Sequence, residues 1–217
     1  MIKYCIFDLD GTLLNTIRSI TYYVNKTLAS FGIDPITEDE CKIFVGDGAR
    51  KLIERSLLSK GIISEEINER VLLKYNADYD ADPYYLTEPY PGIPELLASL
   101  RQRGLVLGVL SNKPDPTAVS VVRRFFGDTF AFIAGGKDGV PLKPDPTSVN
   151  AMLSEMGGTP SALAFIGDTA VDIKTAKNAG AHLSVGVSWG FRDKSELERA
   201  GADVIVDSAL DILTECV

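Results

Sequence analysis

The chain reads Phe7-Asp8-Leu9-Asp10-Gly11-Thr12 where the apolar run from Ile2 to Phe7 stops. The run predicts a buried β-strand, and Gly11 predicts the turn that ends it. Two carboxylates on alternate positions raise each other's pKa unless a cation lies between them. Oxygen ligands suit a hard ion such as Mg²⁺, which binds one or two carboxylates and takes its other ligands from water and phosphate. The turn therefore indicates a metal site that serves phosphate chemistry.

The same turn could instead be a surface turn without function or a calcium-binding loop. Asp and Gly are ordinary turn residues, so a surface turn without function stays open. A calcium loop of the EF-hand type fits poorly, because that pattern needs glycine at its sixth position and glutamate at its twelfth. Counted from Asp8, Gly11 is the fourth residue and Ser19 stands at the twelfth position.

Length and cysteine content predict a reduced, cytoplasmic protein. With 217 residues the chain can bury roughly 70% of its unfolded surface, enough for one large domain or a core domain with a smaller satellite. Its three cysteines, Cys5, Cys41 and Cys216, are too widely spaced for a disulfide framework or a zinc site, so we expect free thiols. We expect neither a signal peptide nor a membrane-spanning helix, because acidic residues begin at Asp8 and no long apolar stretch follows.

The charge balance argues against nucleic acid as a partner. The chain has 22 Lys and Arg against 30 Asp and Glu, and the formal charge of −8 has the wrong sign for binding a phosphate backbone. We expect a small phosphate ester as the partner, no membrane contact, and a monomer or homodimer.

Residues 15–83 are expected to form an all-helical domain. Apolar side chains at spacings of three and four predict a first helix of about 16 residues, which ends before Gly32. These side chains belong to Ile17, Ile20, Val24, Leu28 and Phe31. Further helices are predicted from Glu38 to Phe44, from Ala49 to Ser59 and from Ser64 to Asp80.

After residue 91 the pattern changes to short apolar runs that alternate with helical segments such as Ile93 to Arg103 and Val171 to Ala179. The runs are Leu105 to Leu110, Phe130 to Ala134, Ala162 to Ile166, Leu183 to Val187 and Val204 to Val206. Near-continuous apolar strands between helices predict an α/β fold with a doubly wound, parallel, Rossmann-like sheet. The first strand joins this sheet, so the expected core comprises residues 1–14 and 84–217, with linkers near 14–16 and 82–91.

Polar residues stand where these predicted strands end. Because ligands of open parallel sheets bind beyond the carboxyl ends of the strands, these residues should gather at one edge. They are Asp8, Ser111-Asn112-Lys113, Lys143, Gly167-Asp168-Thr169 and Asp172. Lys113 and Lys143 each begin a Lys-Pro-Asp-Pro sequence. The position after the third strand favours Lys143 as the phosphate contact, although Lys113 stays open. Taken singly, Ser111-Asn112 could cap a helix, Lys143 could be a solvated charge, and Asp172 could be an acidic residue favoured in the first turn of a helix.

In this order the motifs resemble those of the haloacid dehalogenase superfamily of aspartate-nucleophile hydrolases, and the inserted helices resemble its cap domain. The resemblance implies that Asp8 attacks phosphorus and becomes an aspartyl phosphate, while Asp10 protonates the leaving oxygen and then activates water. It implies an oxygen leaving group, because enzymes that cleave carbon–halogen bonds do not resemble this chain at Asp10. Ser111 and Lys143 would act on the phosphoryl group, and Thr12 and Asn112 would bind substrate. Mg²⁺ would be held by Asp8, the carbonyl of Asp10 and Asp168, with Asp172 as a further ligand or as support for one.

Within the superfamily the chain is similar to phosphoglycolate phosphatases, through residues 45–52 (Val-Gly-Asp-Gly-Ala-Arg-Lys-Leu) and Val187-Ser188-Trp189-Gly190. Gly46 and Gly48 would allow close approach of the backbone to a small ligand. Arg50 could form a bidentate pair with a substrate carboxylate. The alternative is that Asp47 caps a helix and Arg50 is solvated.

Three other functions stay open at this point. A sugar-phosphate mutase would use the same aspartates but return the phosphoryl group to the sugar. A pyrophosphate or nucleotide hydrolase would need no carboxylate anchor. A receiver-like signalling domain also has an acidic pocket and an acceptor aspartate, but it lacks a helical insertion.

Overall fold

The structure, a computed structural model, describes residues 1–216 and divides into two compact units. The sheet unit contains residues 1–15 together with residues from 88 onward, and the helical unit contains residues 16–87. No helix within the described part of the chain is long and apolar enough to cross a membrane.

A parallel sheet of six strands forms the centre of the sheet unit, in the order β5-β4-β1-β6-β7-β8. The strands are β1 (Tyr4–Phe7), β4 (Val106–Pro114), β5 (Phe132–Gly136), β6 (Leu163–Gly167), β7 (Leu183–Val187) and β8 (Val204–Val206). The expected α/β class is confirmed. β4 continues to Pro114, four residues beyond the predicted end, because Pro114 still pairs with Gly136 of β5 after an irregularity in the register.

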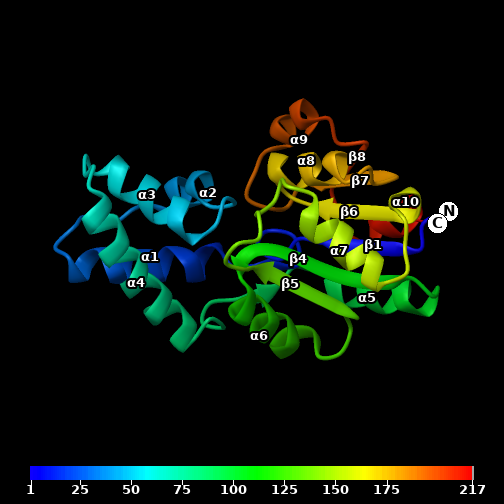
Figure 1. Cartoon of the computed structure of the whole chain (residues 1–217), viewed down its shortest axis with the longest axis horizontal. Helices are drawn as coiled ribbons and strands as arrows, with labels where there is room; N and C mark the ends of the chain where they lie inside the picture. Colours follow the sequence, from blue (N-terminus) through cyan, green and yellow to red (C-terminus); the bar gives the residue numbers. More distant parts are fainter. Residues whose placement is uncertain (217) are drawn as a thin grey trace. The chain divides into compact units, whose positions relative to one another are not determined.

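Helices flank this sheet on both faces (Figure 1). They are α5 (Ile93–Gln102), α6 (Asp115–Phe126), α7 (Thr147–Glu155), α8 (Ala170–Asn178), α9 (Lys194–Ala200) and α10 (Ile212–Glu215), with short 3₁₀ turns at Pro160–Ala162 and Ala209–Asp211. Ile6 of β1 belongs to a buried cluster with Val149 and Met152 of α7. The thiol of the preceding Cys5 contacts that of Cys216, just after α10. Successive strand residues point to opposite faces, so β1 is covered on both sides, as its unbroken apolar sequence predicts.

The helical unit consists of α1 (Ile17–Ser30), α2 (Glu38–Phe44), α3 (Ala49–Ser59) and α4 (Glu65–Ala81). The predicted stripe on α1 is buried at Ile17, Ile20, Val24 and Leu28. Thr37 caps α2 through a capping box with Glu40, and the Ser64 hydroxyl accepts a hydrogen bond from the first turn of α4. Local capping signals thus begin these helices where the sequence predicts them.

Both predicted linkers contain a strand that sequence reasoning missed. β2 (Leu14–Asn15) pairs antiparallel with β3 (Glu88–Pro89) in the sheet unit. Strands of two residues are too short to show an alternating pattern, so only their pairing identifies them. The compact units meet at residues 15/16 and 87/88, whereas the sequence placed the boundaries at 14/15 and 83/84.

Candidate active site

Three neighbouring strands of the sheet carry the predicted site residues at their carboxyl ends. Asp8 follows β1, Ser111 and Asn112 lie in the last part of β4, and Asp168 follows β6. Lys143 comes from the segment between β5 and α7. The strand order β4-β1-β6 therefore brings these side chains to one edge, where parallel α/β sheets bind ligands.

An acidic cluster forms the centre of this edge. Asp8, Asp168 and Asp172 each place a carboxylate oxygen within 4.8 Å of the others, and all three residues are buried. Asp172 belongs to the first turn of α8, where its other carboxylate oxygen accepts hydrogen bonds from the backbone and the hydroxyl of Thr169. The helix start thus fixes the orientation of Asp172 toward the cluster.

Lys143 places its ammonium inside this cluster. Its Nζ lies 2.6 Å from Oδ1 of Asp8 and 2.7 Å from Oδ1 of Asp172, and its side chain is 3% exposed. Burial lowers the pKa of Lys143, but the carboxylates of Asp172 and Asp8 outweigh this effect and the net pKa is raised. Lys143 is therefore a permanent positive charge beside Asp8.

The cluster still carries excess negative charge. With all three buried carboxylates ionised, the one buried ammonium would leave two negative charges without compensation. Burial raises the pKa of Asp8 to about 7, with Lys143 opposing the rise and Asp172 and Asp10 adding to it. Burial together with the charges of Asp172 and Asp8 raises the pKa of Asp168 well above its ordinary value. A divalent cation would supply the missing charge, and carboxylate oxygens are the ligands that Mg²⁺ prefers, so the donor set fits this ion.

Asp168 is held by donors from two distant segments. The Thr12 hydroxyl donates to its Oδ1 at 3.0 Å, and the Phe191 backbone N–H donates to its Oδ2 at 2.8 Å. The Trp189 indole N–H in turn donates to the carbonyl of Thr12 at 3.1 Å. Thr12, predicted to bind substrate, thus supports a carboxylate of the cluster in this structure. The Phe191 contact carries no sequence signal of its own, because a backbone donor can belong to any residue.

Three glycines give the carboxylates room. A Cβ on Gly11 or on Gly190 would lie 2.3 Å or 2.2 Å from an atom of Asp168, and a Cβ on Gly167 would lie 2.2 Å from the Cβ of Asp172. Gly11 also has a φ of +91°, which other residues rarely adopt. Only residues without a side chain therefore fit around the acidic cluster.

Asp10 pairs with a second lysine. Nζ of Lys113 lies 3.0 Å from Oδ2 of Asp10, and these side chains are 7% and 18% exposed. Oδ1 of Asp10 is buried and has no hydrogen-bond partner within residues 1–216. The hydrogen-bonding capacity of this oxygen is therefore unused within the described residues.

Asn112 binds the backbone of Lys143. Its side-chain amide donates to the Lys143 carbonyl at 3.1 Å, and its amide oxygen accepts from the Lys143 N–H at 2.9 Å. The hydroxyl of Ser111 is buried and accepts a hydrogen bond from the Lys113 N–H at 3.2 Å. Asn112, predicted to bind substrate, therefore fixes the segment that presents Lys143.

A family model for haloacid dehalogenase-like hydrolases matches residues 5–185 of the chain. The chain belongs to this hydrolase family. A phosphoglycolate phosphatase of Agrobacterium fabrum is 34% identical over 217 residues, and the match covers 93% of this chain and 87% of that protein. A phosphoglycolate phosphatase of Rhodospirillum rubrum is 33% identical over 213 residues, with 95% and 88% covered.

A solved structure is similar over the full length of this hydrolase. The crystal structure of a candidate phosphoglycolate phosphatase from Lactobacillus delbrueckii subsp. bulgaricus matches with a TM-score of 0.94 at 31% identity. The match covers 99% of this chain and 98% of that chain. The resemblance inferred from the sequence motifs is confirmed: the chain is a haloacid dehalogenase-like hydrolase that resembles phosphoglycolate phosphatases.

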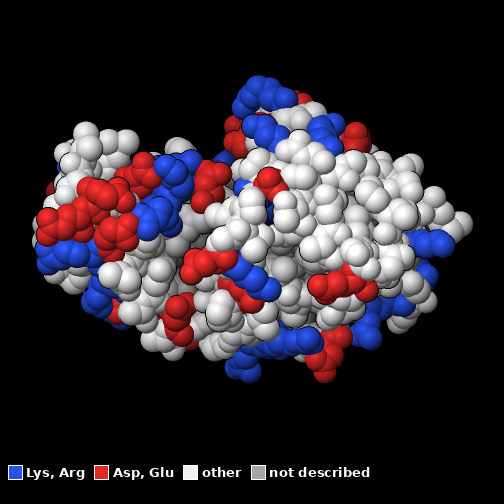
Figure 2. All heavy atoms as spheres, in the orientation of Figure 1, with Lys and Arg blue, Asp and Glu red and all other residues white. Residues whose placement is uncertain are grey.

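The remaining predicted residues of the hydrolase lie in the helical unit. Gly46 and Gly48 have φ values of 114° and 87°, and Gly48 immediately precedes α3. Arg50 pairs with Glu65 at 3.1 Å and with Glu69, both on α4. Acidic and basic side chains lie close together on the surface of this unit (Figure 2). Contact of Gly46, Gly48 and Arg50 with substrate stays a prediction.

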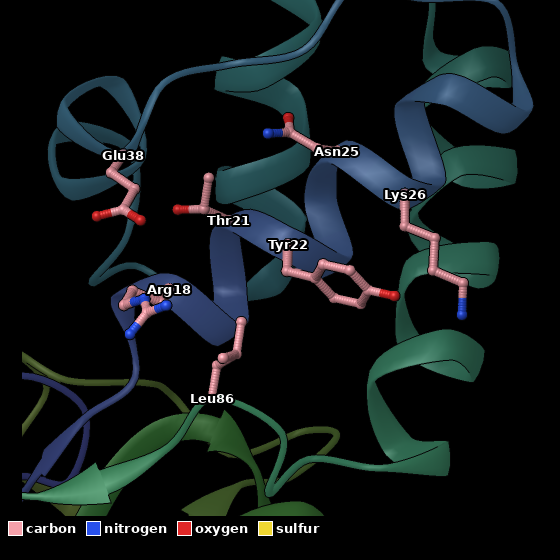
Figure 3. A pocket seen from close by; sticks show the side chains of 7 residues that line it. All are labelled: Arg18, Thr21, Tyr22, Asn25, Lys26, Glu38 and Leu86. Atoms are coloured by element: carbon pink, nitrogen blue, oxygen red, sulfur yellow. The ribbon is translucent and has the colours of Figure 1, made fainter.

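A shallow cavity of about 430 Å³ lies within the helical unit (Figure 3). Its lining residues are Arg18, Thr21, Tyr22, Asn25, Lys26, Glu38 and Leu86. The amide of Asn25 bonds to the backbone of Ile36 in both directions. This bond holds the segment before α2 against α1, and the predicted site residues lie outside the cavity lining.

Proposed function

We propose that this phosphoric monoester hydrolase is a Mg²⁺-dependent phosphatase for 2-phosphoglycolate that works through an aspartyl phosphate. The observation that supports this best is the buried Asp8, bonded to Lys143 within an acidic cluster at the carboxyl edge of the sheet. The curated relatives at 33% and 34% identity are phosphoglycolate phosphatases, which supports the choice of substrate.

The first half-reaction transfers the phosphoryl group to Asp8. Its Oδ1 is bonded to Lys143, which leaves Oδ2 as the attacking atom. A bond forms between Oδ2 and phosphorus while the bond between phosphorus and the ester oxygen breaks, and the departing oxygen takes a proton from Asp10. Covalent catalysis thus divides the hydrolysis into two steps.

The second half-reaction returns Asp8 to its carboxylate form. Asp10 takes a proton from a water molecule, whose oxygen forms a bond to phosphorus while the bond between phosphorus and Oδ2 of Asp8 breaks, and inorganic phosphate is released. Lys143, held by Asn112 and Asp172, neutralises charge on the phosphoryl oxygens in both steps, and Ser111 donates a hydrogen bond to them. Mg²⁺ bound by Asp8, Asp168 and the Asp10 carbonyl would neutralise the remaining charge, with Asp172 as a further ligand or support.

The helical unit is proposed to be a cap that limits the access of water to this site. In this role Gly46, Gly48 and Arg50 would approach the glycolate part of the substrate. We also propose that the enzyme acts in the cytoplasm, consistent with its three free cysteines. Its state as a monomer or a homodimer stays a prediction.

The direct test measures inorganic phosphate released from 2-phosphoglycolate, an aryl phosphate and a hexose phosphate, with Mg²⁺ and with a chelator. We expect magnesium-dependent release with a preference for 2-phosphoglycolate. Release of phosphate from the other esters alone would support phosphatase activity but reject 2-phosphoglycolate as the substrate. Transfer of phosphate within the hexose, without release, would indicate a mutase.

The intermediate is tested with Asp10→Asn. This variant keeps the nucleophile but cannot activate water, so the phosphorylated Asp8 should form slowly and persist. Mass spectrometry after mixing with 2-phosphoglycolate and rapid quenching should detect the added phosphoryl group on the peptide that contains Asp8. Absence of this adduct, with normal turnover, would contradict the role of Asp10.

A further inference from the structure

A nearly buried ammonium group lies beside Asp10. Lys113 stands near the carboxyl end of β4, and its Nζ is 3.0 Å from Oδ2 of Asp10. Its backbone N–H is held by the hydroxyl of Ser111 at 3.2 Å. Main chain and side chain are thus both fixed at the edge that carries the acidic cluster, and the ammonium lies on the Asp10 side of it.

The role of Asp10 limits where the rest of the substrate can lie. A general acid comes within about 3 Å of the oxygen that it protonates. The Lys113 ammonium contacts Oδ2 of Asp10, so it lies within about 8 Å of a leaving oxygen that is bound to either oxygen of this carboxyl group. In 2-phosphoglycolate a single methylene carbon separates this oxygen from the carboxylate. The carboxylate of the bound substrate therefore falls within reach of Lys113.

The other two cations considered for the site each bond to two other carboxylates. Lys143 bonds to Asp8 and Asp172 and so faces the transferred phosphoryl group. Arg50 bonds to Glu65 and Glu69 on α4 of the helical unit. A substrate carboxylate adds negative charge beside the acidic cluster of Asp8, Asp168 and Asp172, which is unfavourable unless a cation lies close to it. Lys113 already occupies the position that this pairing requires.

We propose that Lys113 binds the carboxylate of the substrate and thereby selects 2-phosphoglycolate over uncharged phosphate esters. The inference rests on the proposed function and names the recognition group for the leaving part of the substrate. An ammonium has three N–H donors, so Lys113 can bond to the substrate carboxylate while it keeps its contact with Asp10. Recognition of the leaving group then belongs to the same unit as the nucleophile.

The test compares 2-phosphoglycolate with ethyl phosphate, which has the same ester oxygen but no carboxylate. Lys113→Met keeps the length of the side chain and removes its charge, whereas Lys113→Arg keeps the charge. Lys137→Met is the matched control, because Lys137 pairs with Asp115 at 3.4 Å and is 56% exposed. For each variant kcat and KM are measured on both esters with saturating Mg²⁺, and thermal unfolding verifies the fold.

We expect Lys113→Met to lower kcat on both esters, because Asp10 loses its partner. Its KM for 2-phosphoglycolate should rise at least tenfold, and the ratio of kcat/KM between the two esters should fall by at least the same factor. Lys113→Arg should keep this ratio within about threefold of the wild type, and Lys137→Met should leave it unchanged. Lys113→Gln, which can still donate to Asp10, replaces Lys113→Met where that variant does not fold.

An equal loss on both esters would overturn the inference, since it would mean that Lys113 only positions Asp10. Loss of the preference in Arg50→Met, with the preference intact in Lys113→Met, would also overturn it and assign the carboxylate to Arg50. If the wild-type enzyme hydrolyses both esters without preference, it does not recognise the substrate carboxylate through Lys113, although it is still a phosphatase. A wild-type enzyme that hydrolyses neither would reject the proposed function itself.

Discussion

Asp8 is buried, accepts a hydrogen bond from an ammonium and lies against two further carboxylates. In water these carboxylates would be solvated, but here their repulsion is balanced only in part by Lys143. Acidic groups gather at the ends of the strands. This gathering places Asp8 where it is predicted to act as a nucleophile, and it also produces the excess of negative charge around Asp8. Both can be tested by removing one charge.

Asp8→Asn should abolish turnover and leave the metal-free fold at least as stable as the wild type. The amide cannot form the aspartyl phosphate, so we expect a loss of at least about 10³-fold in kcat. It also removes one of the buried like charges, so the free energy of unfolding without metal should not decrease. Phosphate release and urea unfolding measure the two effects. Activity close to that of the wild type would reject Asp8 as the nucleophile.

The raised pKa of Asp8 predicts how stability depends on pH. Burial raises this pKa from 3.8 to about 7, so between these values the folded chain holds a proton that the unfolded chain has released. Stability of the metal-free protein should therefore fall as the pH rises through this window, by on the order of a few kcal/mol.

Urea unfolding at about pH 5 and about pH 8 measures this dependence, with and without Mg²⁺. We expect lower stability at the higher pH without metal, and a smaller or reversed difference with Mg²⁺, which binds the ionised cluster. Equal stability of the metal-free protein at both pH values would contradict the raised pKa of Asp8 and the excess of negative charge that contributes to it.

The carboxyl ends of β1, β4 and β6 hold the residues of the site in position. Gly167 ends β6 directly before Asp168, and the first turn of α8 places Asp172 against it. A Cβ on Gly167 would lie 2.2 Å from the Cβ of Asp172, so any side chain there displaces the start of the helix. Because Asp172 bonds to Lys143, a side chain at position 167 would also displace Lys143.

Gly167→Ala should therefore reduce activity by at least about 10²-fold and weaken Mg²⁺ binding, because Asp172 must move. The matched control is Gly108→Ala in β4, whose Cβ would come closest to the flexible ends of Met156 and Met152, at 2.8 and 2.9 Å, with the Phe132 carbonyl at an ordinary 3.5 Å. We expect this control to cost less than about 1.5 kcal/mol in stability and to keep most of the activity. Steady-state kinetics and calorimetric titration with Mg²⁺ compare the variants. Similar behaviour of both would show that the close contact at Gly167 can relax.

The two ends of the described chain meet in the sheet unit (Figure 1). The Sγ atoms of Cys5 in β1 and Cys216 after α10 are 3.9 Å apart, and both residues are buried. The sequence predicts free thiols, and no sequence pattern indicates that these two, 211 residues apart, are neighbours. Only the folded chain, in which α10 packs against α5, brings them together.

Mild oxidation by a low-molecular-weight disulfide should join Cys5 to Cys216 and stabilise the fold. A link that closes a loop of this length contributes roughly 5 kcal/mol in the chain-entropy description, less any strain. Thiol titration in denaturant should then find Cys41 alone in reduced form, and the unfolding temperature should rise. Cys216→Ser is the control that cannot form the link. Three titratable thiols and an unchanged unfolding temperature after prolonged oxidation would contradict the prediction.

Much of the architecture could be inferred from the sequence by itself. Continuous apolar runs predict the buried strands, and apolar residues at spacings of three and four predict a helix. The parallel sheet and the four helices of the helical unit are therefore expected from the sequence. The strand ends also indicated Asp8, Ser111, Lys143 and Asp168 as neighbours, since parallel strands bring their carboxyl ends to one edge.

Tertiary structure alone decided how these groups pair. Lys113 and Lys143 begin identical tetrapeptides, yet the first pairs with Asp10 and the second with Asp8 and Asp172. Asn112 bonds to a backbone 31 residues away, and the amide of Phe191 binds Asp168 from a segment after β7. Periodicity reports burial, which is a local property of the sequence, whereas the partner of a polar group depends on distances between segments that only the folded chain establishes.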